Sequence, residues 1–413
     1  MEKIYGLIGR KLGHSYSVPI HEQLGNPKYK LYELEPDEVE AFLRRDDIGA
    51  MNVTIPYKKD AYRICDILSD QAKAIGSVNT VVRLPDGRLS GYNTDIFGFE
   101  YMAKKAGIDF CGKKVVVFGS GGSSLTAQAA SKEMGAREVI VISRTGQNNY
   151  ENLHLHSDAQ ILVNTTPVGM YPNTGVFAAD PELFPKCEGA LDLIYNPCRT
   201  AFILKAQALG IPCIDGLPML VAQGVLADAF FFNKKMNEED IERILLDLRK
   251  NMMNIVIVGM PGSGKTTIAN ELARLTGRRI IDVDKVIGQR AGCDIPTIFA
   301  EQGEAAFRNM EREATSWAGM QSGCIISTGG GVVKDERNYP SLHQNGRIYH
   351  ISRDINKLAR EGRPLSQSGD LEKMASERAP MYARFADKVI ENDSTIEAAA
   401  AAIRSDYCEN IGN

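Results

Sequence analysis

The sequence has few of the features that mark a secreted or membrane-bound protein. Its eight cysteines are scattered through 413 residues without a C-x-x-C pair, which argues against a disulfide framework and a structural zinc site. No apolar run approaches the ~18 residues of a membrane-spanning helix, and the N-terminus lacks the apolar stretch of a signal peptide. The 48 basic and 52 acidic residues give a net charge of −4, so neither nucleic acid nor an anionic membrane is expected as a main partner. These absences predict a cytoplasmic enzyme.

The pattern of apolar residues predicts an α/β fold with more than one domain. At about 150 residues per domain, the length corresponds to two or three domains. Strand-like runs that alternate with helical periodicity predict parallel sheets throughout. The stretches 115–122 and 255–265 share one order of elements, namely an apolar strand, a glycine turn and a helix. An amphipathic helix expected from about 237 to 250 separates them, and we expect the main boundary at its end.

Residues 259–266 (GMPGSGKT) match the phosphate-binding pattern G-x-x-x-x-G-K-[ST] at every fixed position. Glycines let successive backbone N–H groups face the phosphates, and the following helix adds its positive end. The pattern predicts that Lys265 reaches the β- and γ-phosphates and that the Thr266 hydroxyl joins a Mg²⁺ shell. A chance glycine turn is the alternative interpretation. The expected ATP-binding residues are Gly259, Gly262, Ser263, Gly264, Lys265, Thr266 and Thr267.

The rest of this half contains a series of short motifs. Asp282 and Asp284 follow an apolar strand at 279–281, and residues 303–311 read G-E-x-x-F-R-x-x-E. A triple glycine follows the strand at 324–326. Further motifs are Arg363-Pro364-Leu365 and an arginine four residues before Tyr382. In this order the motifs resemble shikimate kinase over residues 253–403.

The resemblance implies a role for each of these residues. Asp282 supports the Mg²⁺ shell, and Asp284 contacts the shikimate hydroxyls as catalytic base or orienter. Arg308 and Arg378 bind the substrate carboxylate, and Arg363 moves with a lid onto the transferred phosphate. The glycines that approach the ring are Gly329, Gly330 and Gly331. From the residues alone, an Asp-x-Asp pair could equally cap a loop, and a single arginine could be a solvated surface charge.

The first glycine turn is a partial dinucleotide fingerprint. Its first two glycines fit, but Ser124 stands at the third small position. The next strand ends in Ser143-Arg144-Thr145, where an NAD enzyme would place an acid for the ribose 2′-hydroxyl. Hydroxyls and a guanidinium suit a 2′-phosphate, so NADP is expected rather than NAD. The expected cofactor-binding residues here are Gly119, Ser120, Gly121, Gly122, Ser123, Ser143, Arg144 and Thr145.

Seven further motifs surround this turn. They are HSYS at 14–17, NVTIPYK at 52–58, SVNT at 77–80, GYNTD at 91–95, NTTPVGM at 164–170, DLIYNP at 192–197 and GLPMLVAQ at 216–223. Together they resemble shikimate dehydrogenase over residues 1 to roughly 250.

Reduction of a ring ketone needs a hydride donor on one face and a proton donor at the oxygen. Lys58 can supply the proton, and Asp95 would orient Lys58 and share the proton. The resemblance implies that Ser15 and Ser17 hold the substrate carboxylate. It also assigns Thr54, Asn79, Asp95 and Gln223 to the hydroxyls, Tyr195 to the pocket, and Thr165 and Gly216 to the cofactor. From the residues alone, Lys58 could lie in an exposed loop, and Asp95 could cap a helix starting near Phe97.

One segment departs from the family pattern. Only residues 146–163 separate Thr145 from Asn164, which is short for the usual helix and strand. We expect one crossover helix of the cofactor domain to be shortened or lost.

Both resemblances together predict a bifunctional enzyme that reduces 3-dehydroshikimate with NADPH and then phosphorylates shikimate with Mg²⁺-ATP. The expected domains are an α/β substrate domain at 1–99 (with 216–250 packing on it), a Rossmann-type NADP-binding domain at 100–215, and a P-loop, nucleoside-monophosphate-kinase-like α/β domain at 252–413. Two alternatives stay open for the first half. One is an NAD-dependent quinate/shikimate dehydrogenase, and the other is a catalytically weak module attached to an active kinase.

Overall fold

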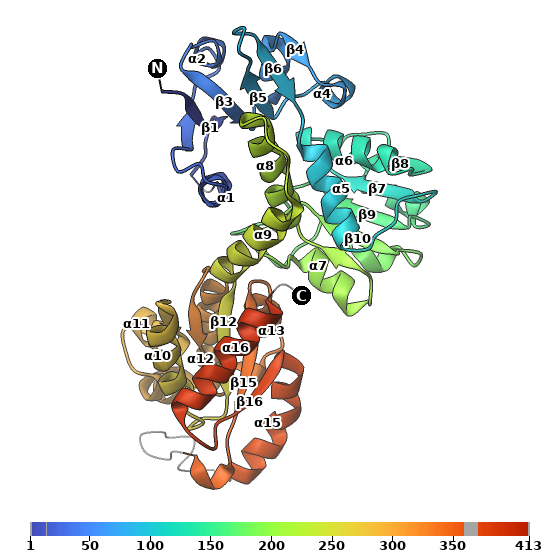
Figure 1. Cartoon of the computed structure of the whole chain (residues 1–413). Helices are drawn as coiled ribbons and strands as arrows, with labels where there is room; N and C mark the ends of the chain where they lie inside the picture. Colours follow the sequence, from blue (N-terminus) through green and yellow to red (C-terminus); the bar gives the residue numbers. More distant parts are fainter. Residues whose placement is uncertain (1, 14, 359–370, 412–413) are drawn as a thin grey trace. The chain divides into compact units, whose positions relative to one another are not determined.

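The computed structural model describes residues 2–13, 15–358 and 371–411, and the chain divides into two compact units. The first unit holds residues 1–169, 176–195 and 202–245. The second holds residues 170–175, 196–201 and 246–413. Helix α9 (Glu238–Met252) contains the boundary between residues 245 and 246 (Figure 1). This helix confirms the one predicted from 237 to 250.

The first sheet of the first unit is mixed, with the strand order β2-β1-β3-β5-β6-β4. Its strands are β1 (Ile4–Gly9), β2 (Lys30–Glu33), β3 (Ile48–Val53), β4 (Ile67–Leu68), β5 (Thr80–Arg83) and β6 (Leu89–Tyr92). Strand β5 runs antiparallel to both β3 and β6, so the expectation of parallel sheets throughout is wrong here. The physical reason is the short turn between β5 and β6, where Gly87 adopts φ +89°, because a turn of this length joins antiparallel neighbours.

Helices enclose this sheet and connect it to the next. They are α1 (Ser17–Gln23), α2 (Val39–Leu43), α3 (Lys58–Ile64), α4 (Asp70–Ile75), α5 (Asp95–Lys105) and α8 (Leu217–Phe231). Helix α5 packs along α8, and α8 also contacts β3 and β5. Fully buried Ile8, Met51 and Val81 lie in the core of the sheet.

The second sheet of the first unit is entirely parallel, in the order β11-β10-β9-β7-β8. Its strands are β7 (Lys114–Phe118), β8 (Glu138–Ile142), β9 (Ile161–Asn164), β10 (Gly189–Asp192) and β11 (Cys213–Ile214). The accompanying elements are α6 (Gly122–Glu133), α7 (Ala201–Ala208) and the 3₁₀ turns η1 (Leu153–His156) and η2 (Pro181–Leu183). Strand β7 is buried throughout, as expected for a central parallel strand.

The sheet of the second unit is also parallel, in the order β13-β14-β12-β15-β16. Its strands are β12 (Asn254–Gly259), β13 (Ile280–Asp282), β14 (Ile325–Ser327), β15 (Gly346–Ser352) and β16 (Lys388–Glu391). The helices are α10 (Lys265–Thr276), α11 (Val283–Ala291), α12 (Ile295–Gly319), α13 (Asn338–His343), α15 (Leu371–Phe385) and α16 (Ile396–Asn410), with the 3₁₀ turns η3 (Val332–Lys334) and η4 (Ile355–Lys357). Gly303 interrupts α12 with φ +80°.

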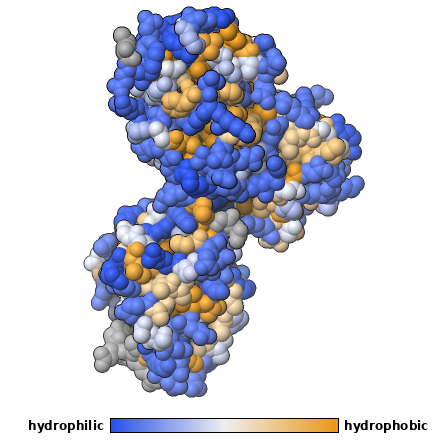
Figure 2. All heavy atoms as spheres, in the orientation of Figure 1, coloured by the Kyte–Doolittle hydropathy of each residue, from blue (hydrophilic) through white to orange (hydrophobic). Residues whose placement is uncertain are grey.

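Hydrophilic residues cover much of the face seen in Figure 2, with apolar residues between them. No helix within the described part of the chain is both long and apolar enough to cross a membrane. All eight cysteines are free thiols. The predicted α/β class with parallel sheets is confirmed for the second and third sheets.

Candidate active sites

A cavity of about 500 Å³ in the first unit gathers the residues predicted to bind the dehydrogenase substrate. Segments far apart in the sequence contribute to its wall, because β3, α3, α5 and α8 all end or begin beside it. The wall includes Lys58 and every predicted substrate residue, namely Ser15, Ser17, Thr54, Asn79, Asp95, Tyr195 and Gln223.

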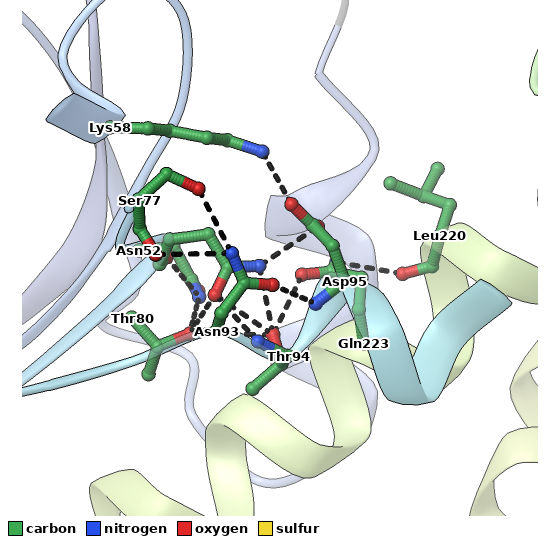
Figure 3. Close-up of polar contacts among 10 residues, drawn as sticks. Asn52, Lys58, Ser77, Thr80, Asn93, Thr94, Asp95, Leu220 and Gln223 are labelled. Atoms are coloured by element: carbon green, nitrogen blue, oxygen red, sulfur yellow. Dashed lines mark hydrogen bonds and ion pairs between the residues drawn. The ribbon is translucent and has the colours of Figure 1, made fainter. Parts of the chain in front are cut away.

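Lys58 and Asp95 form an ion pair at this cavity (Figure 3). Lys58 is the first residue of α3 and Asp95 the first residue of α5, and Nζ lies 2.6 Å from Oδ2. The other carboxylate oxygen, Oδ1, accepts a hydrogen bond of 2.8 Å from Asn79 Nδ2. The N-cap of α5 is Thr94, not Asp95. The Asp95 side chain is therefore directed at Lys58 and Asn79 rather than used as a helix cap.

Neighbouring groups orient the other polar residues of the wall. Asn79 Oδ1 accepts from the Thr94 backbone N–H at 2.8 Å, and Gln223 Nε2 donates to the Leu220 carbonyl at 2.8 Å. Ser15 Oγ accepts from the Ser17 backbone N–H at 3.2 Å. These bonds fix the directions in which amide and hydroxyl groups face the cavity.

Tyr195 closes the wall together with Tyr16, whose ring meets it edge to face at 5.8 Å between centroids. Burial, and then the neighbouring Tyr16, raise the pKa of Tyr195. Its hydroxyl therefore stays protonated at neutral pH and can serve as a hydrogen-bond donor.

Three polar residues of the wall were not predicted as site residues from the sequence: Lys11, Tyr16 and Asn52. Lys11 forms no ion pair among the described residues, whereas the charge of Lys58 is matched by Asp95. No other Lys, Arg, Asp or Glu lies in the described wall, so it carries one unmatched positive charge and suits a monoanionic ligand. The signal available in the sequence was the position of Lys11, four residues before Ser15 in a glycine-containing loop.

The predicted cofactor residues lie at the carboxyl edge of the second sheet. Gly119 follows β7 with φ +104°, and a Cβ there would lie 2.8 Å from Thr165 Oγ1. By contrast, Cβ atoms built on Gly121 and Gly122 would meet nothing within 4 Å. Helix α6 begins at Gly122, so its N-terminus faces open space, which suits a pyrophosphate.

The remaining cofactor candidates border this region. Ser123 and Gly216 line the substrate cavity itself, and a Cβ on Gly216 would lie 2.2 Å from the Leu193 carbonyl oxygen. Arg144 and Thr145, beyond the end of β8, are exposed and available to a bound group. The α6 N-terminus thus borders both open space at Gly121 and Gly122 and, through Ser123, the substrate cavity.

The segment between β8 and β9 contains the 3₁₀ turn η1 in place of a crossover helix. Local hydrogen bonds hold this segment, including one from the Asn149 backbone N–H to Asn152 Oδ1 at 2.8 Å. The loss of a crossover helix, predicted from the short spacing, is confirmed. The strand pairing of β9 with β7 is intact, so the sheet does not depend on that helix.

A second cavity, of about 750 Å³, lies in the second unit beside the glycine-rich loop. The loop glycines Gly259, Gly262 and Gly264 adopt φ +153°, +85° and +95°. Lys265 Nζ donates to the Gly259 and Met260 carbonyls at 2.8 and 3.0 Å. The predicted residues in the wall are Lys265, Thr266, Asp282, Asp284, Arg308, Gly329, Gly330, Gly331 and Arg378. Lys265 and Thr266, which are predicted to face the phosphates, therefore line the same cavity as the predicted substrate-binding residues.

The two aspartates have different local roles. Asp282 is the N-cap of α11, and its Oδ1 accepts from the Lys285 backbone N–H at 3.2 Å. It therefore caps a helix and also lines the cavity. Asp284 and Thr266 line the same cavity. Among the described residues no cluster of three or more His, Cys, Asp or Glu side chains could hold a metal alone. Mg²⁺ needs only one or two carboxylates when phosphate oxygens complete its shell, so these residues fit it.

The two arginines are largely buried rather than solvated. Arg308 Nη1 lies 2.6 Å from Glu311 Oε2, and Arg378 Nη1 donates to the Gly330 carbonyl at 3.0 Å. Tyr382 donates to the same carbonyl at 2.6 Å, and burial raises the pKa of Tyr382 to about 12. These contacts hold both guanidinium groups at the cavity wall.

Neighbouring atoms approach the three glycines at 329–331 so closely that side chains would not fit there. A Cβ on Gly331 would lie 2.4 Å from Arg308 Nη1, and one on Gly329 would lie 2.7 Å from Asp284 Oδ1. Gly330 would meet Pro261 Cδ at 2.6 Å. The predicted lid residue Arg363 lies outside the described residues.

Comparisons with known proteins cover both units. Residues 261–407 match the family model of shikimate kinase, and residues 7–81 match that of the shikimate dehydrogenase substrate binding domain. Over 268 residues the chain is 35% identical to the shikimate dehydrogenase (NADP(+)) of Clostridium perfringens (strain SM101 / Type A), which covers 60% of this chain and 98% of that protein.

Solved structures agree over the first unit. A chorismate mutase/shikimate 5-dehydrogenase fusion protein from Clostridium acetobutylicum has a TM-score of 0.57 at 32% identity, covering 60% of this chain and 97% of that chain. The shikimate 5-dehydrogenase of Thermus thermophilus, in complex with NADP(H) and shikimate, has a TM-score of 0.53 at 32% identity. The match covers 59% of this chain and 98% of that chain.

The triple glycine gives a first prediction. In Gly331→Ala the new methyl group displaces the Arg308 guanidinium, so kcat/KM for shikimate in the ATP-dependent reaction should fall about tenfold or more. The dehydrogenase activity of the same variant is the control, because Gly331 lies in the second unit. Coupled ADP release measures the kinase reaction, and an unchanged kcat/KM in Gly331→Ala would show that this close approach does not matter.

Lys11 gives a second prediction. Lys11→Gln removes the unmatched charge, so KM for shikimate in the NADP-dependent reaction should rise several-fold while kcat changes less. Raising the salt concentration to about 1 M should reduce the difference in KM between the variant and the parent protein, because salt screens the charge of exposed Lys11. Lys59→Gln, an exposed lysine outside the wall, is the matched control. Equal KM values for the two variants would rule out the charge argument.

Proposed function

The chain belongs to the shikimate dehydrogenase family and carries a shikimate kinase domain C-terminal to it, and on this premise we propose that it catalyses two consecutive steps on one cyclic acid. The first unit reduces 3-dehydroshikimate to shikimate with NADPH. The second unit transfers the γ-phosphate of ATP to the shikimate 3-hydroxyl in a Mg²⁺-dependent reaction. The observation that carries the proposal is that each unit has its own cavity, lined by the residues expected to bind the cyclic substrate of its reaction.

In the first cavity, Lys58 is the group that gives the proton to the ketone oxygen. Its 2.6 Å contact with Asp95 holds Nζ in place for this transfer. Asn79, Thr54 and Gln223 orient the ring by its hydroxyls, and the serines of the 15–17 loop hold the carboxylate. NADPH, when bound along the α6 N-terminus and Arg144, supplies the hydride.

In the second cavity, Arg308 and Arg378 hold the shikimate carboxylate, and Asp284 faces the hydroxyl that is phosphorylated. Lys265 and the loop N–H groups hold the phosphates of ATP, with Thr266 and Asp282 as the metal-side residues. Mg²⁺, when bound, neutralises charge on the transferred phosphoryl group. Arginine suits the carboxylate because its planar fork binds both oxygens.

The direct test is one spectrophotometric experiment on the full chain. Shikimate and NADP⁺ should produce NADPH, and addition of ATP with Mg²⁺ should then release ADP. Absence of either signal with the parent protein would overturn the corresponding half of the proposal. We also propose a cytoplasmic location, which the eight free thiols support.

Substitutions should separate the two activities. Lys58→Ala should lower dehydrogenase kcat at least a hundredfold, because general acid catalysis contributes roughly 10²–10⁴, and leave kinase turnover unchanged. Lys265→Ala should do the reverse. Each activity is the control for the other, since both are measured on the same preparation. Loss of both activities in either variant would contradict two independent sites, whereas the expected result would rule out a catalytically weak first unit.

The cofactor assignment has its own test. Arg144→Asp should weaken NADPH binding far more than NADH binding, because the new carboxylate repels the 2′-phosphate and accepts from a 2′-hydroxyl. Arg137→Asp, at another exposed arginine of the same unit, controls for the charge change alone. Fluorescence titration with each cofactor measures the effect. An equal loss for both cofactors would remove Arg144 from the 2′-phosphate site and reopen the NAD-dependent alternative.

A further inference from the structure

We propose that His21, held by Asp228, is a positioning residue of the dehydrogenase site that supports Asp95 through a hydrogen-bonded chain of Asn52, Thr80 and Asn79. This inference rests on the proposed dehydrogenase function. His21 lies on α1 and does not line the cavity. It acts on the site through Asn52, which does line it.

The His21 ring is enclosed on all sides. Its exposure is 1% and that of Asp228 is 0%. The ring stacks on Tyr29, with 3.9 Å between centroids and 7° between planes. Nδ1 lies 3.3 Å from Asp228 Oδ1, and Nε2 lies 3.1 Å from Asn52 Oδ1. A buried polar ring is costly unless both nitrogens are satisfied, and here each nitrogen has one polar partner.

The orientation of the Asn52 amide fixes which ring nitrogen carries hydrogen. Asn52 Nδ2 donates to the Asn79 carbonyl at 3.4 Å and to Thr80 Oγ1 at 3.3 Å. A backbone carbonyl only accepts, so the amino side of Asn52 must face β5. Its oxygen then faces His21 and also accepts from the Tyr29 hydroxyl at 2.7 Å. His21 Nε2 is therefore a donor.

From Asn52 the hydrogen bonds run in one direction to the catalytic pair (Figure 3). The Thr80 hydroxyl accepts from Asn52 and donates to Asn79 Oδ1 at 3.0 Å. The same Asn79 oxygen accepts from the Thr94 backbone N–H at 2.8 Å. With these two donors on its oxygen, Asn79 directs Nδ2 to Asp95 Oδ1, at 2.8 Å. Lys58 occupies the other oxygen of Asp95.

Reversal of the hydrogen bond between His21 and Asn52 would break the first link of this chain. If Nε2 accepted, Asn52 would turn its amino group to the ring and its oxygen to the Asn79 carbonyl, where two acceptors would meet. The Asp228 carboxylate holds the ring in place from the other side, because its Oδ1 lies 3.3 Å from Nδ1 while Lys234 Nζ holds Oδ2 at 2.6 Å. Directional chains of buried hydrogen bonds are strong when complete and costly when broken.

Two variants separate the two ring contacts. A glutamine amide reaches the position of Nε2, so His21→Gln keeps a donor toward Asn52 and should lower dehydrogenase kcat about threefold or less. An asparagine amide reaches only the position of Nδ1, so His21→Asn loses that donor. For His21→Asn, kcat should fall about ten- to hundredfold, the range typical of groups that orient catalytic residues. Tyr29→Phe, which removes the other donor to Asn52 Oδ1, should cost less than His21→Asn.

The isotope effect on hydride transfer distinguishes positioning from stability. With NADPH deuterated at the transferred position, the isotope effect on kcat should rise in His21→Asn, because a misplaced proton donor makes the chemical step slower. A purely structural role would reduce the active fraction and leave the isotope effect unchanged. A fall in kcat without a rise in the isotope effect, or no difference between His21→Asn and His21→Gln, would overturn the proposal.

The hydrogen on Nε2 can be observed without activity. In protein labelled with ¹⁵N-histidine, the His21 signals are assigned by their loss in His21→Gln, and Nε2 should show the shift of a protonated ring nitrogen. An unprotonated Nε2 would refute the proposed direction even in an active enzyme. If the parent protein instead lacks dehydrogenase activity while Nε2 is protonated, the proposed function fails and the hydrogen-bond direction stands.

Discussion

When neighbouring strands run in the same direction, their carboxyl ends meet at one edge of the sheet and the loops that follow converge there. Gly119 and Thr165 follow β7 and β9, and Gly259 and Gly329 end or follow β12 and β14. The convergence is close enough that a Cβ on Gly119 would lie 2.8 Å from the Thr165 hydroxyl. Parallel pairing thus brings the loops together at both predicted phosphate-binding sites, and the close approach of these loops requires small residues there.

Both cavities also have to keep charged groups in partly buried surroundings, where an unpaired charge is costly. In the first, Lys58 and Asp95 satisfy one another, and a neutral amide from Asn79 completes the carboxylate. In the second, Arg308 is held by Glu311, and Arg378 by a backbone carbonyl. The partners that hold these groups are as necessary as the groups themselves, and several of them come from distant parts of the chain.

The sequence was sufficient where function follows from contiguous residues. The loop at 259–266, the strand before it and the helix after it could be predicted because spacing alone specifies them, and counting residues 146–163 predicted the missing crossover helix. Long-range relations could not be predicted in this way. His21 meets Asp228 across 207 positions. The antiparallel direction of β5 depends on the turn after it, and the periodicity of apolar residues does not reveal strand direction. Lys11 was missed because only its position four residues before Ser15 distinguishes it from a solvated lysine.

The two cavities are built differently because their reactions place charge differently. Reduction of a ketone moves one proton, and a matched Lys58–Asp95 pair can release it while the surrounding amides stay neutral. Phosphoryl transfer places negative charge on the transferred group, and the described wall of the second cavity holds three cations, Lys265, Arg308 and Arg378, together with three carboxylates, Asp282, Asp284 and Glu311. The cations of that wall are therefore matched in number by carboxylates, whereas the described wall of the first cavity keeps one unmatched cation, Lys11.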